Sequence, residues 1–395
     1  MKGFDQYAGK WGENAQLALD TFALKSTKGI PQWILNVMDW GILEEISGYP
    51  PGSYEKDPEN VYRDFLLKCG GCFCDQWIPR NPLSMTHNGY DPETKRGATT
   101  GLEEIILDGI MIDSPEAVIE HLEDNMFPYL EHKALEMREG RSEKIEALIQ
   151  SEVDVQEFFG LDMLKSPYKG FEAFPRLRYG KYGYTNYFMA YSLYPEVIEK
   201  DFSLQADLAV MQNKLSAQAV VEGGLPRVLR LDHDMADSRG MLVNMKSLDE
   251  IWLPHFARSI QPLLDAGIKL LWHCDGNLMD MVPRLIEAGV SGFQGFQYED
   301  GMDYEKICKM RDRDGKSLMI WAGVSVTTTL PHGTISDVAQ QLKWLVDIGP
   351  PVGLVLGASS SVLPGTNRAN VKALIEGLKH YRDKDRGPIA TFQYN

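Results

Sequence analysis

Short apolar runs alternate with longer amphipathic stretches throughout the second half of the chain. From about residue 227, runs such as VLRLDHD, IKLLWHCDG, KSLMIWAGV and PVGLVLGAS are each followed by a stretch with the apolar spacing of a helix. Five strand–helix units in succession are typical of a parallel sheet covered by helices. Gly267, Gly289 and Gly349 come at the ends of the helical stretches, where we expect left-handed helix caps.

The first half of the chain is less regular. IPQWILNVM and CFCDQWIP are candidate strands, PENVYRDFLLK is a candidate helix, and the aromatic segment near 171–193 is expected to supply a further unit. Eight strands predict an α/β fold, a (β/α)8 TIM barrel over residues 29–385, with an N-terminal helical extension over residues 1–28. Residues 1–395 are predicted to form this single domain. A doubly wound open sheet is the alternative fold, although its GxGxxG fingerprint is missing.

Composition and charge narrow the class of protein. The chain has 395 residues, of which 44% are hydrophobic, and a formal net charge of -16. An acidic protein is a poor ligand for nucleic acid, so a small molecule or a protein is the expected partner. We expect no membrane span, because no apolar stretch is long enough. Five cysteines, an odd number, favour a reducing compartment, and we predict a cytoplasmic protein.

Polar residues gather where two of the predicted strands end. In WHCDGN, the alternation of side chains along a strand places His273 and Asp275 on one face and Cys274 on the other. In the preceding strand, LRLDHDMA places Asp232 and Asp234 on one face. In a TIM barrel the carboxyl ends of the strands form the active-site face. The side chains that face the barrel mouth are therefore predicted to be those of His273 and Asp275. The alternative is that Cys274 alone faces it.

The next strand adds a further carboxylate, because FQGFQYEDG ends in Glu299. Clustered carboxylates repel one another unless a cation or a shared proton relieves them. A histidine with carboxylates suits zinc or another divalent ion. The alternative is structural: Asp275 or Asn277 caps the next helix, and the histidine is a core residue.

Two other motifs have weaker functional interpretations. CGGCFC contains Cys69, Cys72 and Cys74, but the second CxxC of a structural zinc site is absent, so we favour core packing. The loop LGASSSVLPGT is rich in glycine and serine and could bind an anion through backbone N–H groups. It has no Walker lysine, and serines that cap the next helix are the preferred explanation.

Four segments together resemble the uroporphyrinogen decarboxylase superfamily. They are LDHDMADSRGMLVNMKSLDEIWLPHF, HCDGN, GFQYEDGMDYEKI and GVSVTTTLPHGTISDV, and the resemblance covers most of the chain after residue 200. It implies a single (β/α)8 barrel, and either a cofactor-free decarboxylase or a zinc-dependent methyltransferase that works with corrinoids. The arginine motif RQAGR of the decarboxylases has no counterpart, since the matching region IPQWILNVMDWGILEEISGYPPGSY contains no arginine.

The resemblance to the methyltransferases implies a set of zinc ligands. His273 matches the histidine of their His-x-Cys motif, and Glu299 matches a glutamate one strand on. Asp275 stands where the cysteine would be, with Cys274 as the alternative ligand. The position of their distant cysteine falls at one of three serines, Ser359, Ser360 and Ser361. Oxygen ligands thus replace thiolates, which suits a more Lewis-acidic zinc and an oxygen leaving group.

The resemblance therefore implies an O-demethylating methyltransferase. We expect zinc on His273, Asp275 and Glu299, with Asp232 or Asp234 as proton source or as partner to the ligands. The methyl group would pass from a small methoxylated, aromatic donor to a Co(I) cobamide. A separate corrinoid protein would carry the cobamide, because the Asp-x-His-x-x-Gly loop of cobalamin-binding domains is not found in the chain.

Three other functions stay open at this point. One is a thiol-directed methylcobamide methyltransferase, and another is a metal-free decarboxylase or lyase in which Asp232 or Asp234 stabilises a cationic intermediate. The third is a non-catalytic barrel that serves as a binding or regulatory subunit. The sequence leaves the oligomeric state open, with a homodimer as one option.

Overall fold

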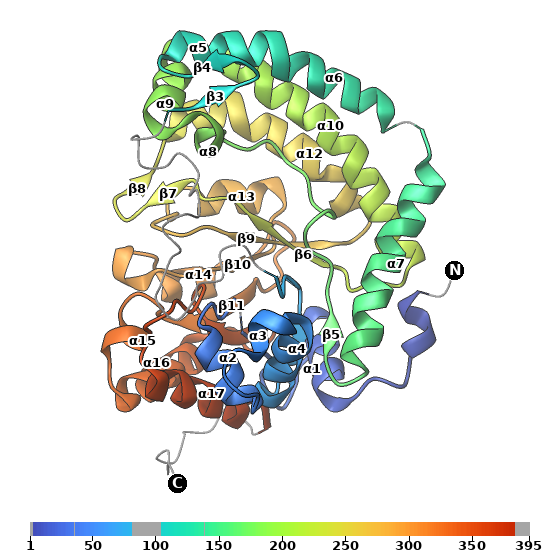
Figure 1. Cartoon of the computed structure of the whole chain (residues 1–395), viewed down its shortest axis with the longest axis vertical. Helices are drawn as coiled ribbons and strands as arrows, with labels where there is room; N and C mark the ends of the chain where they lie inside the picture. The colour runs from blue at the N-terminus through green and yellow to red at the C-terminus, as the bar shows by residue number, and fades with distance from the viewer. Residues whose placement is uncertain (1–2, 35, 81–103, 138, 384–395) are drawn as a thin grey trace.

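The computed structural model describes residues 3–34, 36–80, 104–137 and 139–383. A six-stranded parallel sheet lies at its centre (Figure 1). In spatial order the strands are β1 (Gln32–Trp33), β12 (Leu354–Ala358), β11 (Met319–Val324), β10 (Gly292–Gln294), β9 (Lys269–His273) and β6 (Val228–Asp232). The last of these strands in the chain, β12, thus pairs with the first, β1. That connectivity belongs to a closed barrel and not to a doubly wound sheet.

Two short parallel strands, β2 (Phe73–Cys74) and β5 (Leu164–Lys165), continue the series. The N–H of Cys72 donates to the carbonyl oxygen of Gln32 at 3.1 Å, which places β2 beside β1. The strand order is therefore β6-β9-β10-β11-β12-β1-β2-β5. The predicted (β/α)8 barrel is confirmed.

Helices follow the strands of the second half, as predicted, and α12, α16 and α17 pack directly on the sheet. They are α11 (Met245–Ser247), the π-helical turn η3 (Leu248–Trp252), α12 (Leu253–Asp265), α13 (Val282–Ala288), the 3-10 turn η4 (Tyr298–Asp300), α14 (Tyr304–Lys309), α15 (Thr329–His332), α16 (Ile335–Ile348) and α17 (Arg368–Asp383). The hairpin of β7 (Ala236–Asp237) and β8 (Gly240–Met241) follows β6.

The glycines after these helices differ in their backbone conformation. Gly267 (φ +71°) and Gly289 (φ +118°) are left-handed, as predicted. The prediction is wrong for Gly349, whose φ is -59°. A Cβ at that position would lie 2.6 Å from the carbonyl oxygen of Leu345. Glycine is needed there because the backbone passes close to the helix end.

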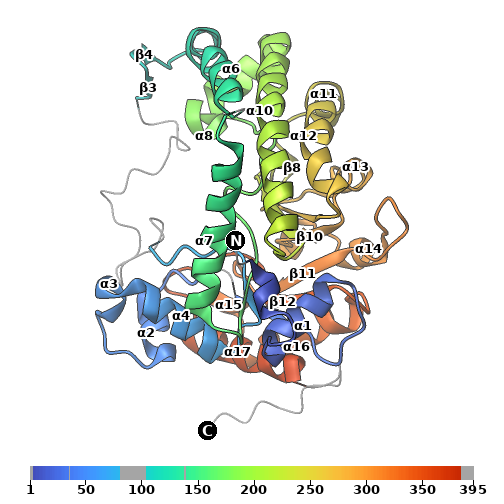
Figure 2. The same ribbon diagram turned by 90° about the vertical axis from the view of Figure 1, so that its right-hand side faces the viewer.

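The helices between β2 and β6 gather at one end of the molecule, except α7 (Arg141–Phe159), which runs from there along the side towards the other end (Figures 1 and 2). In chain order they are α5 (Pro115–His121), the π-helical turn η2 (Leu122–Met126), α6 (Phe127–Glu136), α7, α8 (Tyr179–Tyr182), α9 (Tyr184–Leu193) and α10 (Pro195–Glu222). The hairpin of β3 (Ile106–Leu107) and β4 (Ile110–Met111) packs on α5. Figures 1 and 2 show α6, α10 and α12 at this end and α2, α4 and α17 at the other.

The aromatic segment near 171–193 does not supply the strand predicted for it. It forms α8 and α9, and the strand of that unit, β5, comes before it. The reason is the spacing of the rings: Tyr184, Tyr187, Phe188 and Tyr191 recur at helical intervals. Three pairs of these rings have centroids within 6.5 Å of each other, namely Tyr184–Phe188, Tyr187–Phe188 and Tyr187–Tyr191.

The N-terminal segment covers the amino ends of the barrel strands. It consists of a 3-10 turn, η1 (Phe4–Tyr7), and helix α1 (Glu13–Phe22). The ring of Phe22 lies 4.9 Å from that of Phe73 and 6.1 Å from that of Trp321, both of which lie on barrel strands. Helices α2 (Trp40–Ser47), α3 (Ser53–Lys56) and α4 (Pro58–Cys69) then connect β1 to β2.

The cysteines of CGGCFC belong to the core, as the sequence predicted. Cys69, Cys72 and Cys74 are buried where α4 runs into β2, and burial raises the pKa of all three thiols. The sulfur of Cys72 accepts the backbone N–H of Gln32 at 3.4 Å. In the described parts of the chain, no helix combines the length and the apolar character that a bilayer span needs.

Candidate active site

Four polar residues meet at the carboxyl ends of β6 and β9. Asp232 ends β6 and His273 ends β9, and the two are partners in the sheet register. Asp234 and Asp275 follow each strand two residues later. One ligand atom from each of Asp234, His273 and Asp275 lies within 4.8 Å of the other two. The Nε2 atom of His273 is 3.9 Å from Oδ1 of Asp275 and 4.0 Å from Oδ1 of Asp232.

The backbone around this group is fixed by hydrogen bonds between the two strand ends. The carboxylate of Asp234 accepts the backbone N–H of Asp275 at 2.8 Å, and its carbonyl oxygen accepts the hydroxyl of Tyr179 at 2.8 Å. Two atoms are buried and have no hydrogen-bond partner among the described residues, Nδ1 of His273 and Oδ1 of Asp275. Buried polar atoms are normally satisfied, so these two atoms are candidates for binding a ligand.

A glycine leaves the space that the histidine ring occupies. Gly295 follows β10 with φ +83°, and a Cβ at that position would lie 2.4 Å from Nδ1 of His273. Any side chain there would push the imidazole out of place. The sequence motif FQGFQ thus contributes to the site through the missing side chain of its glycine.

The neighbours of the site residues point the other way, as strand alternation predicts. The sulfur of Cys274 is buried and accepts the backbone N–H of Met235 at 3.3 Å, and burial raises the pKa of this thiol. On β6, the Nε2 atom of His233 accepts the backbone N–H of Leu177 at 2.9 Å. Burial lowers the pKa of His233 to about 3, so its ring is neutral. Neither side chain belongs to the group around His273.

Glu299 is placed differently from the other predicted ligands. It lies in η4, beyond the turn that Gly295 makes after β10. Its carboxylate accepts hydrogen bonds from the hydroxyls of Ser325, at 2.9 Å, and Thr327. The structure thus joins Asp234 to His273 and Asp275, and gives Glu299 partners on the loop after β11. A role for Glu299 as a ligand stays a prediction.

The serine loop after β12 ties three strand ends together. The hydroxyl of Ser359 accepts the backbone N–H of Val326 at 3.1 Å, and its carbonyl oxygen accepts the amide of Gln294 at 3.0 Å. Ser359 is buried, whereas Ser360 and Ser361 are half-buried. These bonds give Ser359 a structural role at the barrel mouth.

A buried arginine beside the site was not predicted. Arg230 on β6 is 1% exposed, and its guanidinium donates to Asp75 at 2.8 Å and to Asp232 at 3.2 Å. The hydroxyl of Tyr168 donates to the same oxygen of Asp232 at 2.7 Å, and its ring lies 4.5 Å from the guanidinium. Arg230 shares the strand face of Asp232 in VLRLDHD, and this parity was the signal in the sequence. Asp75, 155 residues away, has no such signal.

The carboxyl groups of the site titrate in opposite directions. Burial raises the pKa of Asp232, but the charges of His273 and Arg230 and the bond from Tyr168 outweigh it and lower the pKa to about 2. Burial raises the pKa of Asp234, assisted by the Asp275 carboxylate and opposed by His273. Asp232 therefore stays ionised at neutral pH, while Asp234 and Asp275 repel each other. A bound cation would relieve that repulsion.

The residues present fit a divalent metal. One imidazole and two carboxylates converge, and one of these carboxylate oxygens is buried without a hydrogen-bond partner among the described residues. Nitrogen and oxygen donors of this kind bind zinc and other divalent transition metals. The capping alternative is not supported for Asp275: helix α13 begins after Met281 without a side-chain cap bond. Asn277 instead closes a local turn by accepting the N–H of Met279 at 3.2 Å.

Comparisons with known proteins show the fold. No protein-family model matches the chain, and no curated protein matches it. A methyltransferase from Methanosarcina mazei superposes with a TM-score of 0.54 at 14% identity, over 93% of this chain and 98% of that chain. A B12-independent methionine synthase from a Shewanella species, in complex with selenomethionine, matches 47% of this chain and 56% of its own at 16% identity, with a TM-score of 0.34. The second likeness is too low to argue from. The first shows that this chain shares its barrel fold with a methyltransferase over nearly its whole length.

Proposed function

We propose that the protein is a zinc-dependent methyltransferase that moves a methyl group from a methoxylated aromatic compound to the Co(I) corrinoid of a partner protein. The observation that carries this proposal is the group formed by Asp234, His273 and Asp275. It lies at the carboxyl ends of barrel strands, where TIM-barrel enzymes place their chemistry. The fold shared with a methyltransferase supports methyl transfer as the reaction.

Asp234, His273 and Asp275 would hold the zinc ion. The set differs from the one that the sequence predicted, because Asp234 lies closer to the histidine than strand order suggested and Glu299 bonds elsewhere. When bound, zinc supplies a Lewis acid that draws electron density from an ether oxygen. A ligand set of nitrogen and oxygen, without thiolate, supports an oxygen leaving group over a thiol acceptor.

Asp232 acts on the histidine and does not supply a proton in this proposal. Its pKa of about 2 keeps it ionised, and the bonds from Tyr168 and Arg230 hold the carboxylate in place. Its Oδ1 atom lies 4.0 Å from Nε2 of His273, so its negative charge favours this orientation of the imidazole ring. The phenolate that leaves takes its proton from solvent or from a neighbouring group.

Aromatic side chains beside the Asp234 loop would contact the ring of the substrate. The rings of Tyr179 and Tyr184 lie 4.7 Å apart and are half-buried, and Tyr179 stacks on His233 at 5.9 Å. The hydroxyl of Tyr179 is held by the backbone of Asp234. Flat apolar surface next to a few fixed polar groups is what a small aromatic ligand requires.

The proposed reaction balances with the methyl donor, the Co(I) corrinoid and one proton. Co(I) on the partner attacks the methyl carbon, the cobalt–carbon bond forms, and the carbon–oxygen bond breaks with its electron pair on oxygen. One proton converts the phenolate to a phenol. The methyl carbon must face outward from the barrel mouth, because the acceptor arrives on another protein.

The test is turnover with a methoxybenzoate and a reduced corrinoid protein. We expect equal amounts of phenol and methyl-cobalt, measured by chromatography and by the visible spectrum of the corrinoid, and no product without the corrinoid protein. His273→Ala should abolish both products, and Cys274→Ser should retain them. Product from a methylated thiol or amine, and none from methoxylated aromatics, would show that the substrate class is wrong. Decarboxylation by the metal-free protein would support the uroporphyrinogen decarboxylase type of activity instead.

A further inference from the structure

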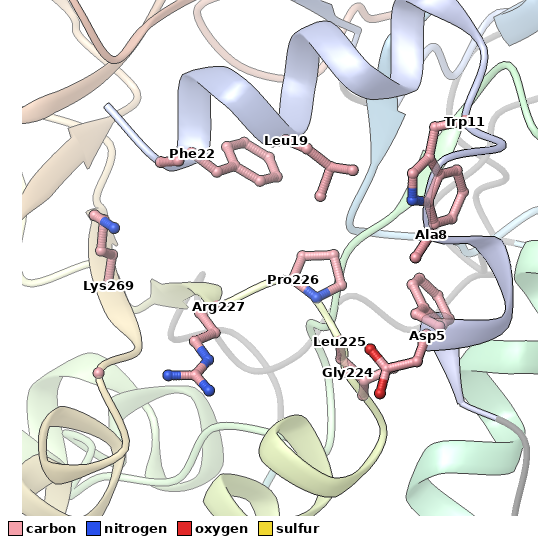
Figure 3. A pocket seen from close by; sticks show the side chains of 13 residues that line it. Asp5, Ala8, Trp11, Leu19, Phe22, Gly224, Leu225, Pro226, Arg227 and Lys269 are labelled. Atoms are coloured by element: carbon pink, nitrogen blue, oxygen red, sulfur yellow. The ribbon is translucent and has the colours of Figure 1, made fainter. Parts of the chain in front are cut away.

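A cavity lies at the end of the barrel opposite the candidate active site (Figure 3). It has a volume of about 360 Å³ and is enclosed by the N-terminal segment on one side and by the chain at 224–227 and 267–269 on the other. A volume of this size is in the range of small-molecule pockets. Lys269 begins β9 and His273 ends it, so the cavity and the candidate active site lie at opposite ends of one strand.

The lining of this cavity is apolar in the middle and charged at its ends. Side chains from η1, α1, the link between them and the segment before β6 form the apolar part, namely Phe4, Ala8, Trp11, Leu19, Phe22 and Pro226. Figure 3 shows Arg227 and Lys269 together at one end and Asp5 at the other, with Pro226 between them. An occupant would therefore have an apolar body and a polar group at the end that faces the two cations.

The two cations are not paired directly with a carboxylate among the described residues, although the charge of Asp312 acts on Lys269. In the described residues, neither Arg227 nor Lys269 forms an ion pair, and the guanidinium of Arg227 donates only to the carbonyl oxygen of Ala266 at 3.2 Å. Their backbones are adjacent, since the backbone N–H of Lys269 donates to the carbonyl oxygen of Arg227 at 2.9 Å. Burial and the charges of Lys316 and Arg227 lower the pKa of Lys269, and the carboxylate of Asp312 opposes this shift. An anion placed between the two side chains would lower the free energy of both.

We propose that this cavity binds a small apolar molecule with a single carboxylate or phosphate group. The anionic group lies between Arg227 and Lys269, and the apolar body packs against Phe22 and Pro226. Asp5 at the far end disfavours a second negative charge there. The site is separate from the proposed reaction and does not depend on it.

The experiment titrates the full chain with benzoate and with phenyl phosphate, using benzamide as the uncharged control. Calorimetry should show that at least one anion binds and that benzamide binds much more weakly; the tighter anion identifies the preferred headgroup. Amide hydrogen exchange should show protection at 4–22 and 224–227. His273→Ala should leave this binding unchanged, which separates it from binding at the carboxyl end of the barrel.

Two variants, each of which removes one positive charge, test whether the anion binds at this cavity. Arg227→Gln should weaken anion binding roughly tenfold, the usual loss for one charged hydrogen bond. Arg227 is exposed, so the variant should fold normally. Lys25→Gln is the matched control, because Lys25 is exposed and pairs with Asp20 at 2.8 Å; it should bind as the unaltered protein does. Absence of binding by both anions, equal binding of benzamide, or protection confined to the His273 end would overturn the proposal.

Discussion

The two ends of strand β9 differ in charge and in the support that their side chains receive. His273 ends the strand in a group of carboxylates, whereas Lys269 begins it beside another cation. Between them, Leu270, Leu271 and Trp272 are buried without charge. The middle of β9 is thus uncharged, and its first and last residues determine the charge at each end.

The support around each end differs as well. Asp232, next to His273, accepts bonds from Tyr168 and from the buried Arg230, so a second layer holds it in place. At the amino end, Arg227 is exposed and Lys269 has no ion-pair partner among the described residues. Fixed second-layer contacts are what catalytic geometry requires, whereas a cavity with loosely held cations suits reversible binding. This difference in support is what we expect if the carboxyl end of β9 is a reaction site and the amino end is a ligand site.

The largest expected effect is the loss of metal from the carboxyl end. Asp275→Ala removes one of the three converging donors and should lower zinc affinity by more than about a hundredfold. Cys274→Ser changes the adjacent residue, whose sulfur points away, and should leave zinc content unchanged. Elemental analysis of protein purified without added metal measures both. If Cys274→Ser empties the site and Asp275→Ala does not, the ligand set contains sulfur and the assignment of faces on β9 is wrong.

The next effect is on the stability of the fold and is expected from breaking the support of Asp232. Arg230→Met leaves the carboxylate of Asp75 buried without its charged partner, which should cost about 3–5 kcal/mol in the free energy of unfolding. Urea denaturation measures this loss. Arg239→Met, which breaks an exposed pair with Asp237, should change stability far less.

Removing both members of the buried ion pair distinguishes the effect of its charges from the effect of lost side-chain packing. The double variant Arg230→Met with Asp75→Leu should recover part of the lost stability. The second substitution removes the buried carboxylate that Arg230→Met leaves without its charged partner. Equal loss in the single and double variants would show that the Arg230 side chain contributes by packing and not by its charge.

The sequence predicted the second half of the barrel because each strand there has a distinct local pattern. IKLLWHCDG has an apolar run that ends in polar residues, and β9 occupies Lys269–His273 within it. β5 could not be found in this way, since it consists only of Leu164–Lys165 and half of it is a lysine. That lysine can be buried because its Nζ atom lies 2.9 Å from the carboxylate of Glu152 and donates to the carbonyl oxygen of Asp75 at 3.0 Å, both of which are tertiary contacts.

The site was predictable to the extent that strand parity determines it. Alternation separated His273 and Asp275 from Cys274, and the structure places them so. The alternation still holds for Asp234 and Asp275, two residues past the ends of β6 and β9, but not for Glu299, which lies beyond the turn at Gly295 and faces other partners. A contact between distant segments, such as that between Arg230 and Asp75, leaves no local pattern in the sequence.

The smallest expected effect tests the charge at the amino end of β9. Lys269→Gln should be equal to or slightly more stable than the unaltered protein at neutral pH. The folded-state pKa of Lys269 lies below 10.5, mainly because of burial and the nearby cations, so the unfolded chain holds this proton more tightly and the charge opposes folding. That opposition is complete at neutral pH and disappears as the pH rises through the folded-state pKa towards 10.5. The stability difference between the two proteins should therefore narrow at alkaline pH, as measured by urea denaturation at low salt.

The control is Lys25→Gln, which loses an exposed ion pair and should show no gain in stability. A clear loss of stability in Lys269→Gln at neutral pH would mean that the lysine is already paired, and the contrast between the two ends of the strand would then fail.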